Sequence, residues 1–104
     1  MSVENLTSET FDSVAGEGCA LVDFWAAWCM PCRMVAPTIE ELAEEFDEKV
    51  TVGKVNVDND GALAARFGIM SIPTVILLRD GKEVKRFIGV QSKDVYADAL
   101  RAEV

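Results

Sequence analysis

Two cysteines, Cys29 and Cys32, are separated by Met30 and Pro31, and this C-x-x-C spacing is typical of a redox-active thiol pair. In the first turn of a helix, residues three positions apart lie on one face, within the Cα separation that a disulfide tolerates. The unpaired N–H groups and the positive dipole end of that turn favour a thiolate, so the pKa of Cys29 should fall. Pro31 suits an early helical position because its missing N–H would be unpaired there. The pattern predicts a nucleophilic thiol with a second thiol close enough to form a disulfide.

Two metal-binding interpretations compete with the redox interpretation. Structural zinc usually takes four ligands from cysteine and histidine, and the chain offers only Cys19 besides the pair, with no histidine. Two thiolates could also bind Cu(I), with Met30 and Met34 nearby. We prefer the redox interpretation and expect no bound metal. We also expect no cofactor, since nothing in the sequence resembles a nucleotide-binding loop.

Asp23 is the second residue that could do chemistry. It interrupts an apolar run over residues 20–25 that predicts a strand buried on both faces. An ionised carboxylate is costly there, so its pKa should rise and it could accept a proton near neutral pH. A carboxylate at a bend or a sheet edge is the alternative. Lys54 interrupts a valine-rich strand over residues 50–57, and it either pairs with Asp23 or extends to solvent.

The surrounding pattern predicts the elements that would position these residues. We expect a short helix from a Thr7 cap to about Val14, a long helix after the cysteines, a short helix over residues 62–67 and a last helix after Ser92. Two further strands, over residues 74–79 and 83–88, flank Asp80-Gly81, a strong hairpin signal. The long helix between the strands over residues 20–25 and 50–57 is long enough for a crossover connection, so we expect these two strands to be parallel. The fold class is therefore α/β, a mixed sheet with helices on both faces.

Composition limits the function classes. With 104 residues, half of them hydrophobic, the chain can form one domain with a real core, and we expect that domain to span residues 1–104. A formal net charge of -8 disfavours nucleic acid. No apolar stretch reaches the roughly 18 residues of a membrane span. The start, from Met1 to Asn5, lacks a secretory signal, so we expect a cytoplasmic protein, and we expect it to be a monomer.

Over its whole length the chain resembles the thioredoxin family. The residues that carry the resemblance are Asp23 to Cys32, Pro37, Lys54, Asp58, Gly68 to Thr74, Gly81 and Gly89. The resemblance implies a central mixed five-stranded sheet flanked by four helices. It also implies a protein-disulfide reductase that cycles between the dithiol and disulfide forms of Cys29 and Cys32. In that cycle Asp23 would help to deprotonate Cys32, and Lys54 would tune Asp23.

The resemblance further implies a client-binding surface around Cys29. Its residues would be Trp28, Met30, Pro31, Met70, Ile72, Pro73 and Gly89. The family's matching proline is cis and lies against the cysteine pair, whereas sequence alone favours a trans Pro73 at the start of a strand. Without the resemblance, Trp25 and Trp28 would be assigned to the core. Pro37 is expected to kink the long helix, and Cys19 is expected to be a small structural residue rather than a regulatory one.

The implied reaction starts with attack of the Cys29 thiolate on a client disulfide, followed by attack of Cys32 on the mixed disulfide. Reduction of the oxidised chain would require a separate flavin- and NADPH-dependent reductase. Two other functions remain open: a thiol oxidase or isomerase with the same fold, and a non-catalytic binding subunit. Met30 departs from the family pattern, in which glycine follows the first cysteine, so the redox potential and the fit to partners could differ from those typical of the family.

Overall fold

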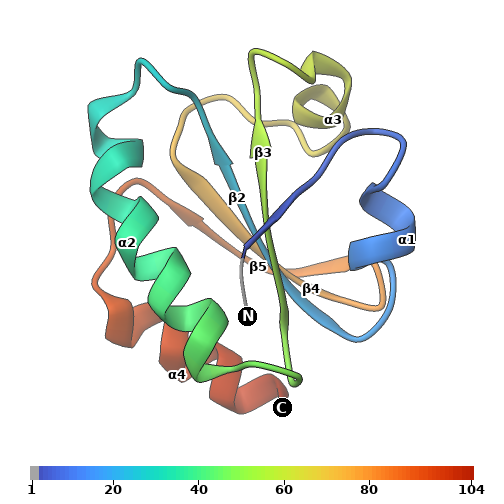
Figure 1. Ribbon diagram of the computed structural model, residues 1–104, viewed down its shortest axis with the longest axis vertical. Helices are drawn as coiled ribbons and strands as arrows, with labels where there is room; N and C mark the ends of the chain where they lie inside the picture. Colours follow the sequence, from blue (N-terminus) through green and yellow to red (C-terminus); the bar gives the residue numbers. More distant parts are fainter. Residues whose placement is uncertain (1–2) are drawn as a thin grey trace.

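A five-stranded mixed sheet with strand order β1-β3-β2-β4-β5 forms the centre of the computed structural model, which describes residues 3–104 (Figure 1). The strands are β1 (Glu4–Asn5), β2 (Cys19–Trp25), β3 (Thr51–Asn56), β4 (Thr74–Arg79) and β5 (Lys82–Ile88). The helices are α1 (Phe11–Ala15), α2 (Met30–Glu45), α3 (Gly61–Arg66) and α4 (Lys93–Glu103). β1 and β2 run parallel to β3, β4 runs antiparallel to β2, and β5 runs antiparallel to β4. The residue pattern predicted the four helices and strands β2 to β5, and the five-stranded sheet that includes β1 was implied by the family resemblance.

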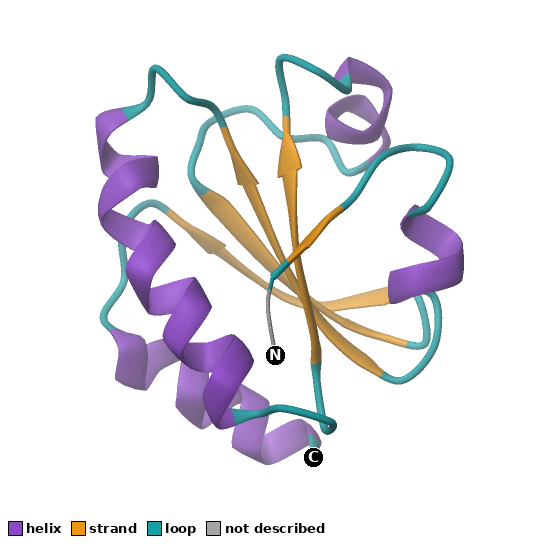
Figure 2. Cartoon of the chain, in the orientation of Figure 1, coloured by secondary structure: helices purple, strands orange, loops and turns teal. Residues whose placement is uncertain are grey.

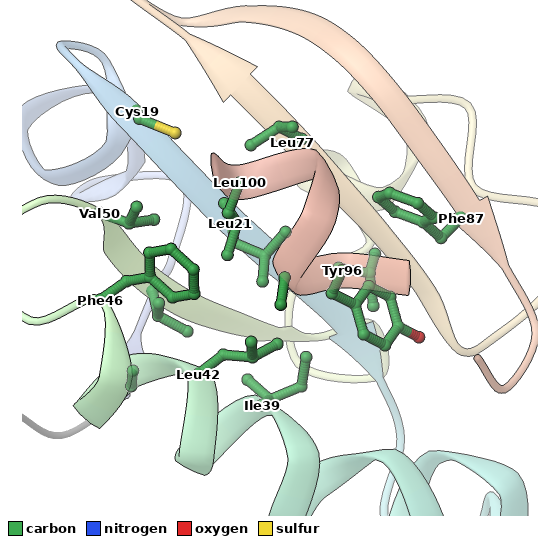
Figure 3. Packing of buried hydrophobic residues seen from close by; sticks show 14 of the residues in the cluster. Cys19, Leu21, Ile39, Leu42, Phe46, Val50, Leu77, Phe87, Tyr96 and Leu100 are labelled. Carbon is green, nitrogen blue, oxygen red and sulfur yellow. The ribbon is translucent and has the colours of Figure 1, made fainter. Parts of the chain in front are cut away.

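Two hydrophobic layers cover the two faces of the sheet, α2 and α4 on one face and α1 and α3 on the other (Figures 1 and 2). The alternation of side chains along β2 explains the division. Cys19 and Leu21 belong to the cluster that includes Tyr96 and Leu100 of α4 (Figure 3). The alternate residues of β2 face the other hydrophobic cluster, under α1 and α3: Ala20, Val22 and Phe24. β2 is therefore buried on both faces, as its sequence predicts.

The first helix begins later than the sequence predicts. Thr7 does not cap it; instead, its carbonyl oxygen accepts hydrogen bonds from the N–H groups of Thr10 and Phe11, at 3.1 and 2.9 Å. The Thr10 hydroxyl accepts the Thr7 N–H at 3.0 Å in return. These bonds close a tight turn, and α1 starts only at Phe11 with Thr10 as its N-cap. The prediction that the start of the chain, from Met1 to Asn5, is not a secretory signal rests partly on Met1 and Ser2, which lie outside the described residues.

The hairpin between β4 and β5 has the turn that its sequence predicts. Asp80 and Gly81 have φ values of 52° and 81°, the left-handed conformation that a two-residue hairpin turn requires at both positions. Asp80 also fixes the neighbouring loop, because its carboxylate accepts the N–H of Gly18 at 2.8 Å while its own N–H donates to the Gly18 carbonyl at 2.9 Å.

The long helix α2 is continuous from Met30 to Glu45, although Pro37 lies inside it.

Gly53 allows β1 to pair with the sheet. A Cβ atom at this position would lie 2.5 Å from Cδ1 and 2.9 Å from Cγ of the buried Leu6 side chain. We expect Gly53→Ala to lower the free energy of unfolding by about 1–3 kcal/mol, because such overpacking displaces neighbouring groups. Urea denaturation measures the effect. Gly61→Ala is the control, since nothing lies within 4 Å of its added Cβ; equal stability of native chain and Gly53→Ala would contradict the close packing of β1.

Candidate active site

Cys29 and Cys32 lie where β2 gives way to α2. Cys29 is the N-cap of α2 in an extended conformation, with φ -90° and ψ 107°, and Pro31 falls in the first turn. The Cys32 N–H donates to Cys29 Sγ at 3.3 Å. The two residues form a disulfide with their Cα atoms 5.3 Å apart. A sulfur atom at this position meets the unpaired N–H groups of a helix N-terminus, which stabilise negative charge.

Both cysteines are recessed beneath exposed apolar side chains. Cys29 is only 4% exposed, whereas Trp28 is 70% and Met70 97% exposed. Met30 and Met34 are also exposed. Single exposed apolar residues are common, but a group of large ones beside one site marks a candidate contact surface. The site therefore presents a recessed sulfur atom surrounded by apolar groups.

Trp28 is held in place at this surface and does not belong to the core. Its indole Nε1 donates to Asp58 Oδ2 at 2.8 Å. The assignment of Trp28 to the core from its residue type alone is wrong, because its side chain lies outside both hydrophobic layers. Trp25 is partly buried and packs against the cysteine pair, and Lys54 Nζ lies 5.1 Å from the centroid of its ring.

The loop before β4 faces the cysteine pair. The Ile72-Pro73 peptide bond is cis, so the trans bond that sequence alone favours is wrong; the tertiary amide of an X-Pro bond makes cis accessible at small cost. The Ile72 carbonyl oxygen lies 3.8 Å from Cys29 Sγ. The Pro73 carbonyl oxygen accepts the N–H of Gly89 at 2.9 Å, and Gly89 has φ 83°, which favours glycine. The loop thus brings a backbone acceptor beside the sulfur atom.

An apolar groove of about 330 Å³ lies next to this loop. It is lined by Trp28, Val57, Ala64, Ile69, Met70, Ser71 and Ile72. The sequence interpretation anticipated Trp28, Met70 and Ile72 at the site but missed Val57, Ala64, Ile69 and Ser71. The one available signal was the position of Val57 at the end of a predicted strand, at the sheet edge where the parallel strand β2 also ends.

Asp23 lies in the middle of β2 and is 3% exposed, so the alternative of a bend or a sheet edge is wrong. Its register partners are Lys54 on β3 and Val75 on β4. Its Oδ1 atom has no hydrogen-bond partner. Burial raises the pKa of Asp23 to about 7, and the positive charge of Lys54 opposes that rise. The carboxyl group can therefore exchange a proton near neutral pH.

A small cavity of about 20 Å³ lies beside Asp23. Its lining residues are Val3, Asp23, Ala36, Ile39, Glu40 and Lys54. The volume is enough for about one water molecule. Lys54 acts on Asp23 through its charge, across the β2–β3 register, while its ammonium group lies over Trp25.

Cys19 lies at the opposite end of β2 from the disulfide. It is buried, and burial raises the pKa of its thiol, although the nearby Arg79 guanidinium opposes that effect. A neutral, buried thiol is a poor nucleophile. Cys19 accordingly packs as a small apolar residue in the layer under α2 and α4.

A mixed sheet between two helical layers, with a C-x-x-C disulfide at the start of α2 facing an X-Pro loop, defines a thiol–disulfide oxidoreductase of the thioredoxin fold. A protein-family model described as Thioredoxin matches residues 2–102. The chain belongs to the thioredoxin family. Family membership and the cysteine pair together support protein-disulfide reductase activity on disulfide substrates.

Individual relatives agree with this assignment. The chain is similar to thioredoxins from Staphylococcus epidermidis, at 44% identity, and from Staphylococcus aureus, at 43%; each match covers 96% of this chain and 96% of the relative. Among solved structures, a mutant thioredoxin from Halobacterium salinarum NRC-1 superposes with a TM-score of 0.90 at 34% identity, covering 98% of this chain and 90% of that one. Within residues 3–104, every helix is too short or too polar to cross a bilayer.

Proposed function

We propose that this chain is a single-domain electron carrier in which Cys29 attacks client disulfides and Cys32 resolves the product. The observation that carries the proposal is the position of Cys29 Sγ, at the N-cap of α2, 3.3 Å from the Cys32 N–H and 3.8 Å from the Ile72 carbonyl oxygen. The N–H can stabilise a thiolate, and the carbonyl borders the path by which a client reaches it.

In the first step, the Cys29 thiolate attacks one sulfur atom of a client disulfide. A new S–S bond joins Cys29 to the client, the client S–S bond breaks, and the second client sulfur leaves as a thiolate that takes a proton from solvent. The client disulfide is thereby half reduced.

In the second step, Cys32 transfers its thiol proton to the Asp23 carboxylate, with Lys54 tuning the proton affinity of that carboxylate. Cys32 then attacks Cys29 Sγ and the mixed disulfide breaks. The client sulfur leaves as a thiolate and takes a proton from solvent, so the client is released as a dithiol. Cys29 and Cys32 are oxidised by two electrons in the process. A carboxyl group with a pKa of about 7 suits this transfer, because it can both accept and release the proton at neutral pH.

The client docks on the apolar surface around the sulfur atom. This client-binding surface consists of Trp28, Met30, Pro31, Met70, Ile72, Pro73 and Gly89. Exposed methionine side chains adapt to varied partners because they are flexible and polarisable. The Ile72 carbonyl offers the client backbone a hydrogen-bond acceptor beside Cys29.

The oxidised chain requires electrons from elsewhere. We assign that task to a flavin- and NADPH-dependent reductase in the cytoplasm, where the chain would act as a monomer and maintain protein thiols in the reduced state. This setting is consistent with Cys19 being a free thiol.

Reduction of insulin disulfides with dithiothreitol as the electron source tests the proposed activity. We expect the native chain to accelerate the reaction and Cys29→Ser to reduce the acceleration at least ~1000-fold, because the substitution removes the nucleophile. Cys19→Ser is the matched control and should retain full activity. Equilibration against glutathione then establishes whether the pair acts as a reductant or as an oxidant. A native chain that does not accelerate the reaction would indicate a binding subunit, and an active Cys29→Ser variant would show that Cys29 is not the nucleophile.

Met30 occupies the position where the family pattern has glycine, and its side chain is exposed beside the disulfide. We expect Met30→Gly to slow insulin reduction by about fivefold, the equivalent of ~1 kcal/mol of lost apolar contact. A small change in redox potential should accompany it. A low-molecular-mass disulfide as substrate separates the two effects, since it does not contact the client-binding surface. If the native chain and Met30→Gly have the same redox potential and reduce insulin at the same rate, Met30 has no role in either property.

A further inference from the structure

Methionine is among the residue types that folded proteins bury most often, yet the three methionines within residues 3–104 are all exposed. Met70 is 97% exposed, and Met30 and Met34 are each 63% exposed. Oxidation of an accessible methionine to its sulfoxide is a common reaction of proteins with oxidants. A dissolved oxidant can therefore reach all three thioether sulfur atoms without any opening of the fold.

Two of these methionines flank the reactive sulfur atom from different segments of the chain. Met30 is the first residue of α2 and follows directly after Cys29, the N-cap. Met70 lies in the loop before β4 and lines the apolar groove together with Trp28 and Ile72. The Ile72 carbonyl oxygen lies 3.8 Å from Cys29 Sγ, so this loop is in contact with the site. A client that brings a disulfide to Cys29 therefore passes both thioether groups.

Oxidation would change the chemistry of this surface. A sulfoxide turns a flexible apolar side chain into a polar one whose oxygen is a strong hydrogen-bond acceptor, and this disrupts interfaces that depend on methionine. Docking of a client over that oxygen removes it from water, which costs free energy unless the client supplies a donor. Varied clients do not share a donor at one position, so the cost applies to most of them.

We propose that Met30 and Met70 are modification sites at which hydrogen peroxide forms methionine sulfoxide and thereby weakens client docking. The thioether sulfur attacks one oxygen atom of the peroxide, the O–O bond breaks and an S–O bond forms. The second oxygen atom leaves as hydroxide, takes the proton of the transferred oxygen and becomes water. The methionine is oxidised and the peroxide is reduced, each by two electrons. This inference rests on the client-binding surface proposed above.

The disulfide form of Cys19→Ser is the protein for the test, because it contains no free thiol that peroxide could oxidise. Peroxide is applied until peptide mass spectrometry shows complete sulfoxide formation at Met30, Met34 and Met70, and is then removed. We expect insulin reduction to slow about tenfold, the effect of burying one acceptor without a donor. Reduction of a low-molecular-mass disulfide should keep its rate. An unchanged insulin rate, or an equal loss with both substrates, overturns the proposal.

Met34 provides the matched control, because it is as exposed as Met30 but lies one turn, about 6 Å, farther along α2 from the disulfide. In Met30→Leu combined with Met70→Leu, only the control methionine and Met1 remain oxidisable, and peroxide should not change the insulin rate. In Met34→Leu the tenfold loss should persist. Each chain is compared with its own untreated sample, so differences in starting rate do not enter. A loss that depends on Met34 instead contradicts the two assigned sites.

Repair distinguishes modification from general damage. Methionine sulfoxide reductases of both stereochemical classes, supplied with dithiothreitol, should restore the insulin rate, because they return the sulfoxide to the thioether. A rate that stays low after mass spectrometry shows complete repair overturns the proposal. An untreated chain that does not reduce insulin would refute the proposed function, whereas a chain that reduces insulin equally well with and without peroxide treatment would refute only the inference about the methionines.

Discussion

Replacement of Cys32 with serine is expected to stop turnover and to leave the chain covalently joined to its clients. Cys29 can still attack, because its position at the N-cap of α2 does not depend on the second thiol. The serine hydroxyl cannot displace the client from Cys29, so the mixed disulfide accumulates. We expect turnover to fall at least ~1000-fold. Non-reducing gel electrophoresis with mass spectrometry detects the trapped complex.

Two control variants make this result specific to the cysteine pair. The double variant Cys29→Ser with Cys32→Ser should trap nothing, and Cys32→Ser combined with Cys19→Ser should trap as much as Cys32→Ser alone. If complexes persist without Cys29, the attacking thiol has been assigned incorrectly.

Asp23→Asn is expected to stabilise the protein at neutral and alkaline pH. The pKa of Asp23 rises from its ordinary value of 3.8 to about 7 in the folded chain. Between these values the folded state holds a proton that the unfolded state has released, so stability falls as the pH rises through this window and stays low above it. The loss amounts to ~4 kcal/mol, and asparagine, which carries no charge, avoids it.

Urea denaturation at a series of pH values measures this effect. The free energies of unfolding of the native chain and of Asp23→Asn should nearly coincide at about pH 4 and diverge up to about pH 8. Glu44→Gln, which replaces an exposed carboxylate on α2, is the control and should follow the native curve. Parallel curves for the native chain and Asp23→Asn would show that Asp23 ionises normally.

The same substitution should cost activity. Asparagine cannot accept the Cys32 proton, so the second step should slow most near neutral pH, where we propose that the native carboxylate acts as a base. The attack by Cys29 should keep its rate. A variant that is both more stable and less active would show that the buried carboxyl group is kept for function, a recurrent trade-off at active sites.

Local chemistry explains why much of the fold could be predicted from the sequence. Asp80-Gly81 specifies its own turn, and the apolar flanks of Asp23 indicate a strand buried on both sides. β1 could not be predicted, because two residues carry no periodicity and their pairing depends on the space that Gly53 leaves for Leu6. The start of α1 was misplaced because Thr7 and Thr10 are both good caps, and only the hydrogen bonds of the turn distinguish them.

The functional site, like the fold, could be predicted only in part from the sequence. The cysteine spacing indicates the chemistry, but the exposure of Trp28 depends on how distant segments meet. The groove combines Trp28 with Ala64 of α3 and the loop around Ile69, which are far apart in the sequence.

The depth of the disulfide determines which molecules can exchange electrons with it. Cys29 is 4% and Cys32 2% exposed, so a folded, convex surface reaches little of either residue. A substrate must offer its own disulfide on a protruding or unfolded strand narrow enough to enter beside the Ile72 carbonyl. We therefore expect disulfides in mobile segments of substrate proteins to react faster than disulfides inside rigid cores.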